Sequence, residues 1–88
     1  MVTNTTDGAN VGLNIEAYST AKLSVNTIIG GNSVKFIGTK PDNSTEIIKH
    51  TGGTMAETTF DVSKYINLSI QMPCIGKNSG ALWIVKLS

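Results

Sequence analysis

The side chains that could support catalysis are few in this sequence of 88 residues, which has one histidine, His50, and one cysteine, Cys74. Nucleophilic catalysis needs a base beside the nucleophile and a third group that orients the base. A lone histidine next to a glycine-rich segment is typical of a solvated strand end, and Cys74 continues the apolar positions of the strand predicted before it. We therefore expect neither residue to be catalytic and predict that the protein is not an enzyme.

The acidic residues are too dispersed to predict a metal centre. The sequence has six of them, which do not cluster: Asp7, Glu16, Asp42, Glu46, Glu57 and Asp61. Calcium binds where several carboxylates or carbonyls converge on one loop. Zinc would have to use Cys74, His50 and carboxylates without the usual ligand spacing. We therefore expect no metal and no cofactor, and we assign Asp42 and Asn43 to a turn.

The charge pattern argues against nucleic acid as a partner. Seven lysines and six acidic residues give a formal net charge of +1, and arginine is absent. Nucleic-acid recognition relies on clustered positive charge and on the planar guanidinium group of arginine. The lysines of this chain are spread singly along the sequence, so we predict no nucleic-acid binding.

The first ten residues differ from the rest of the chain. Residues 1–10 are small and polar, with only Asp7 charged. They lack the basic start and the apolar stretch of a signal peptide, and no run of about 20 apolar residues follows, so we expect cytoplasmic synthesis and no membrane insertion. Because this segment has almost nothing to bury, we expect a flexible N-terminal arm or one that becomes ordered on a neighbouring subunit.

The strands that must position these side chains are predicted from segments in which apolar and polar residues alternate. Apolar and polar residues alternate over 11–18, 33–40 and 66–72, as in strands with one face in a core and the other in water. No segment of helical periodicity is present. The sequence predicts an all-β fold: a single small antiparallel β-sandwich of about seven short strands over residues 11–88, jelly-roll or immunoglobulin-like, with no substantial helix.

Turn residues separate these segments. Gly30-Gly31-Asn32 accepts positive φ, which predicts a hairpin between strands over 21–29 and 33–40. Pro41, Asp42 and Asn43 predict the next turn, because proline presets φ and the two polar side chains can bond the local backbone.

Tyr18 and Tyr65 are the residues most suited to contact a sugar. Sandwiches that bind sugars present exposed aromatic rings as stacking platforms. Trp83, Phe36 and Phe60 share the parity of apolar neighbours, so we expect these three in the core. The two tyrosines lie at predicted strand ends and remain as candidate glycan contacts.

The last predicted strand has too many adjacent apolar residues for a strand with one solvent-exposed face. Leu82, Trp83, Ile84 and Val85 follow one another without a polar break. Successive strand residues point to opposite faces, so this run predicts a strand that is dry on both sides. We assign Leu82 and Ile84 to a contact with another subunit, and we assign to the core Trp83, Val85 and Leu87 together with Ile66, Leu68, Ile70 and Met72. Parity alone leaves the exchange of the two faces open.

Two segments resemble small virion proteins of tailed bacteriophages: 33–43 (SVKFIGTKPDN) and 60–70 (FDVSKYINLSI). In those proteins a strand leads to a turn that contains aspartate, and an Asp-Val-x-x-Tyr turn opens a long alternating strand. The resemblance covers residues 20–88 and implies a head-fibre, head-decoration or tail-associated structural protein. Ile47 and Ile48 stand where those proteins have an aromatic residue.

These observations lead to two hypotheses from different functional classes. The first is a non-enzymatic structural subunit of a phage virion, made in the host cytoplasm. The resemblance implies a homo-oligomer, a trimer in preference to a dimer, with other virion proteins as partners. The alternative is a carbohydrate-binding β-sandwich module for surface attachment, which uses Tyr18 and Tyr65.

Overall fold

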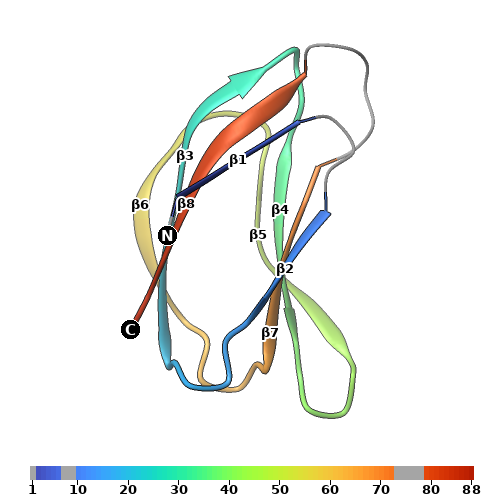
Figure 1. Ribbon diagram of the computed structural model, residues 1–88, viewed down its shortest axis with the longest axis vertical. Coiled ribbons are helices and arrows are strands. Elements are labelled where there is room, and N and C mark those ends of the chain that lie inside the picture. The colour runs from blue at the N-terminus through green and yellow to red at the C-terminus, as the bar shows by residue number, and fades with distance from the viewer. Residues whose placement is uncertain (1, 7–9, 73–78) are drawn as a thin grey trace.

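The computed structural model, shown in Figure 1, describes residues 2–6, 10–72 and 79–88. These residues form no helix and eight strands: β1 (Val2–Thr6), β2 (Asn10–Asn14), β3 (Thr20–Ile29), β4 (Val34–Thr39), β5 (Thr45–Thr51), β6 (Met55–Asp61), β7 (Asn67–Gln71) and β8 (Gly80–Leu87). Two four-stranded sheets, antiparallel throughout, face each other as layers. The predicted all-β sandwich is confirmed, with eight strands instead of about seven.

The order of the strands identifies the kind of sandwich. One sheet has the order β1-β8-β3-β6, and we call it the β8 sheet; the other has the order β2-β7-β4-β5, and we call it the β7 sheet. Four of the strand pairs are those of one long hairpin: β1·β8, β2·β7, β3·β6 and β4·β5. This hairpin is folded over into two sheets, in which β3 also pairs with β8 and β4 also pairs with β7. This is a jelly roll, so the topology selects that alternative over the immunoglobulin-like one.

The hairpin predicted at Gly30-Gly31-Asn32 is wrong. β3 and β4 belong to different sheets, so this turn carries the chain across the sandwich. Gly30 and Gly31 have φ of 71° and 73°, so the predicted need for positive φ is met. Turn residues specify a reversal of the chain but not the strand that pairs laterally, and β3 already has β6 and β8 on its two sides. The turn predicted after Lys40 does join a hairpin, between β4 and β5.

The core lies between the layers and takes alternate residues from the strands of both sheets. Its buried residues are Ile15, Ala21, Leu23, Val25, Val34, Phe36, Val62, Tyr65, Leu68, Ile70, Met72, Ala81, Trp83 and Val85. Trp83 and Phe36 are fully buried, and Phe60 and Leu87 pack partly buried against the cluster. These four positions agree with the predicted core. Ile66, predicted to lie there too, is only half-buried in the bend before β7.

The N-terminal residues are not an arm where the structure describes them. Val2–Thr6 forms the edge strand β1, in antiparallel register with β8 from Val2 opposite Ile84 to Thr6 opposite Gly80. An edge strand can be held by backbone hydrogen bonds alone, so a polar segment with little to bury can still join a sheet. Residues 7–9 of the expected arm lie outside the described residues. β8 is consequently an inner strand, between β1 and β3.

Candidate functional site

The last strand presents different residues to its two faces. Ala81, Trp83 and Val85 are buried between the sheets, whereas Leu82 and Ile84 are half-buried on the outer face of the β8 sheet. Trp83 and Val85 are thus inward, as predicted. The prediction of a strand dry on both sides holds for the inner face, and on the outer face the single chain covers the two side chains only in part. We call Leu82 and Ile84 the β8 patch.

Charged residues border the β8 patch at one end. Lys86, the next outward residue of β8, is exposed and pairs with Glu57 of β6, with Nζ 2.9 Å from Oε2. The hydrogen bond from Lys86 lowers the pKa of Glu57, and the charges of Lys86 and Lys22 lower it further. Lys22 of β3 lies opposite Lys86 in the ladder. The apolar surface on β8 therefore ends where this group of charges begins.

Polar residues of β3 flank the patch on one side. Ser24 lies opposite Ile84 and Thr27 lies opposite Leu82, across a register shift in β3. Ser24 is 6% exposed although it faces outward in register with a half-buried residue. On the β3 side, the apolar stripe formed by Leu82 and Ile84 therefore ends at polar residues.

Tyr65 does not present an exposed ring, which the predicted glycan contact required. Its side chain is 7% exposed, and the ring lies against Gly38 of β4 so closely that a Cβ at that glycine would come within 2.6 Å of ring atom Cδ1. The Tyr65 hydroxyl donates a hydrogen bond of 2.7 Å to Glu46 Oε1. Burial raises the pKa of Tyr65, and the Glu46 carboxylate raises it further. Tyr65 is therefore a packing residue, and this candidate is corrected.

Tyr18 does present a surface. It is 41% exposed in the connection between β2 and β3, where its backbone N–H donates to the carbonyl of Ile15 at 3.0 Å. Of the two tyrosines proposed as stacking platforms, only this one has an accessible ring.

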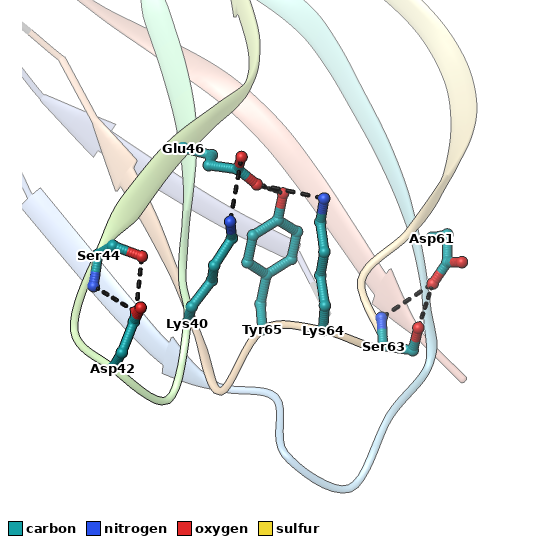
Figure 2. A network of polar contacts seen from close by, with 8 residues as sticks. All are labelled: Lys40, Asp42, Ser44, Glu46, Asp61, Ser63, Lys64 and Tyr65. Carbon is teal, nitrogen blue, oxygen red and sulfur yellow. Dashed lines mark hydrogen bonds and ion pairs between the residues drawn. The ribbon is translucent and has the colours of Figure 1, made fainter.

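Glu46 is the centre of a polar network that joins two turns of the molecule (Figure 2). Besides Tyr65, its carboxylate contacts Lys64 Nζ at 3.3 Å and Lys40 Nζ at 3.3 Å. The Lys64 ammonium also lies 5.4 Å from the centre of the Tyr65 ring. Hydrogen bonds from Tyr65, Lys64 and Lys40 lower the pKa of Glu46 from 4.5 to about 2. The network ties the β4–β5 hairpin to the turn between β6 and β7.

Two aspartates cap turns with the same geometry, and Figure 2 shows both turns together with the Glu46 network. Asp42 Oδ1 accepts from the Ser44 backbone N–H at 3.0 Å and from its hydroxyl at 2.6 Å. Asp61 Oδ1 accepts the equivalent bonds from Ser63 at 2.9 and 2.7 Å. The serine hydroxyl and then the serine N–H lower the pKa of each aspartate. The turn-capping role predicted for Asp42 is the one observed.

Asn43 completes the first of these turns. It has φ of 70°, the left-handed conformation that asparagine tolerates better than most residues, and its N–H donates to the carbonyl of Lys40 at 2.9 Å.

Of the two residues first considered for catalysis, the structure describes only His50. His50 is exposed near the end of β5, where Nε2 lies 3.3 Å from Ser33 Oγ. Cys74 lies outside the described residues. Within residues 2–6, 10–72 and 79–88, no group of three side chains could hold a metal ion. The same part of the chain contains no helix long and apolar enough to cross a membrane.

No local pattern in the sequence predicts the Glu46 network. Glu46 and Tyr65 are 19 positions apart, and Glu46 was noted only as one of several dispersed acids. Only the pairing of distant strands brings the two together. No protein-family model, curated protein or solved structure matches this chain.

Proposed function

We propose that the chain is a structural subunit of a phage virion, a head-fibre or capsid-decoration protein, that forms a homo-oligomer through the β8 patch. The observation that carries this proposal is the position of Leu82 and Ile84: they are only half-buried, on the outer face of an inner strand. Apolar side chains gathered on an outer face mark interaction surfaces in soluble proteins. The resemblance to phage virion proteins supports the choice of particle, and a trimer is favoured over a dimer for the same reason.

The size of the molecule is consistent with such an assembly. The accessible surface is 4763 Å², and a typical specific interface covers roughly 800 Å² on each partner. One interface would thus cover about a sixth of the surface. A chain of this length has a thin core, and association with further copies is an available source of stability.

The chemistry of the described side chains favours a structural role over an enzymatic one. The carboxylates of Glu46, Glu57, Asp42 and Asp61 are each bonded to lysines, serines or Tyr65 of the chain itself. Such groups hold turns and strands together and are not poised as a general acid or base. For the rival carbohydrate module, the burial of Tyr65 removes one of the two rings on which that hypothesis depended.

Native mass measurement of three proteins at micromolar concentration tests this function. We expect an oligomer for the wild type and a monomer for Leu82→Asp, because a carboxylate in a closed apolar contact carries a large desolvation cost. Ile47→Asp is the matched control: Ile47 is 60% exposed on the edge strand β5 of the other sheet, so the variant should remain an oligomer. A monomeric wild type overturns the proposal, as does dissociation by Ile47→Asp alone.

A further inference from the structure

A row of polar side chains crosses the outer face of the β7 sheet near one end. Lys35 of β4 is in register with His50 of β5 on one side and with Gln71 of β7 on the other. Ser33, just before β4, lies 3.3 Å from His50 through its hydroxyl. Together with Met72 these residues line a depression with a volume of about 420 Å³. Small-molecule sites fall in the range of roughly 300–1,000 Å³, so the depression has the size of a binding site.

The charge in this depression is positive and unpaired within the described residues. The ion pairs found there use Lys40, Lys64 and Lys86, and none involves Lys35. The described lining includes no acidic residue. A ligand with one negative charge would therefore meet the Lys35 ammonium group without a competing carboxylate in the described lining.

The other lining groups specify more than charge. The Gln71 amide and the Ser33 hydroxyl each donate and accept hydrogen bonds, which suits the hydroxyl groups of a sugar. Met72, which is 5% exposed, is the apolar member of the described lining. The one ammonium group of the described lining matches a carboxylate better than a phosphate dianion, which proteins bind with arginine or with several donors.

We propose that the depression formed by Ser33, Lys35, His50, Gln71 and Met72 binds a sugar acid, a monosaccharide unit that carries one carboxylate next to hydroxyl groups. Lys35 pairs with the carboxylate, and Gln71 and Ser33 bond to the flanking hydroxyls. This site uses none of the tyrosines considered earlier and lies on the opposite sheet from the β8 patch. The proposed sugar-acid site does not depend on the proposed oligomer.

Titration with glucuronate, followed by backbone amide NMR shifts in the intact protein, tests the proposal. We expect saturable shifts at the ends of β4, β5 and β7, with glucose and inorganic phosphate giving none at the same millimolar concentrations. Lys35→Gln should weaken glucuronate binding roughly tenfold or more, because it removes a charge-assisted hydrogen bond. Lys49→Gln is the control. Lys49 is an exposed lysine next to His50, but its register partner is the buried Phe36 and not Lys35, so its loss should leave the affinity for glucuronate unchanged.

Three results overturn the proposal. They are the absence of saturable shifts with glucuronate, binding of phosphate as tight as that of glucuronate, and an equal loss of affinity in Lys35→Gln and Lys49→Gln. Gln71→Ala provides a second variant, which leaves the charge of Lys35 in place. It should weaken glucuronate binding several-fold. Acetate, which has no hydroxyls, should bind equally to the wild type and to Gln71→Ala. The oligomeric state of Leu82→Asp does not enter this test, so failure here is distinguishable from failure of the proposed assembly.

Discussion

β7 and β8 occupy equivalent places in the two sheets and differ in what they turn outward. Each is an inner strand that buries alternate apolar side chains, Leu68 and Ile70 in β7 and Trp83 and Val85 in β8. The outward residues of β7 are Asn67, Ser69 and Gln71, whereas those of β8 are Leu82, Ile84 and Lys86. The jelly roll needs apolar residues only on the inner face, so the outward chemistry is free to serve another purpose. This difference underlies the two proposals, a partner contact on the β8 sheet and a small-ligand site on the β7 sheet.

The outer face of the β7 sheet also carries two apolar residues. Ile37 of β4 and Ile47 of β5 lie opposite each other on the outer face. Ile47 belongs to an edge strand and is 60% exposed, whereas the β8 patch lies on an inner strand. This pair makes Ile47 the informative control for any claim about Leu82 and Ile84.

The largest expected effect separates the two faces of β8. Trp83→Ala removes a fully buried side chain and should lower the free energy of unfolding by about 3–5 kcal/mol. Leu82→Ala, on the outer face, should cost about 1 kcal/mol under conditions in which the protein is monomeric. Urea denaturation of dilute protein measures both. Equal losses in the two variants would show that the outer face is as well packed as the core.

The next effect concerns the inner face of the β7 sheet. Gly38→Ala places a methyl group 2.6 Å from a Tyr65 ring carbon, so the ring must move. We expect a loss of about 1–3 kcal/mol in unfolding free energy from this overpacking. Gly52→Ala is the control, because nothing lies within 4 Å of a Cβ built at Gly52. Thermal or urea unfolding of the two variants makes the comparison, and similar stabilities would contradict the close contact.

A smaller effect tests the network at the end of the sandwich. The pKa of Glu46 is about 2 in the folded protein and 4.5 ordinarily, so the carboxylate contributes stability that is present above pH 4.5 and lost as the pH falls toward 2. Glu46→Gln should therefore lose less stability than the wild type over that range. Urea denaturation between pH 6 and pH 2 measures the two curves. Parallel curves would mean that other carboxylates carry the acid sensitivity.

The sequence was a good guide to which side chains are buried, since burial alternates with a period of two along a strand. That regularity placed Phe36, Ile70, Trp83 and Val85 correctly before any pairing was known. Pairing itself was not accessible, because it depends on residues far apart in sequence. The turn at Gly30 was therefore assigned to a hairpin, although it crosses between the sheets.

The two proposed binding surfaces differ in the same way in how far the sequence predicts them. The β8 patch could be predicted because four adjacent apolar residues are a local feature. The row formed by His50, Lys35 and Gln71 could not, because three strands must come into register to create it. Val2–Thr6 was predicted as part of an arm because composition reports burial and not backbone pairing.

Sedimentation velocity of the wild-type protein over a series of micromolar dilutions tests the central claim most directly. We expect a species larger than the 9.3 kDa chain that dissociates on dilution, together with a monomer for Ile84→Asp at every concentration. A wild type that sediments as a 9.3 kDa monomer throughout the series would contradict the assignment of the β8 patch to a subunit contact.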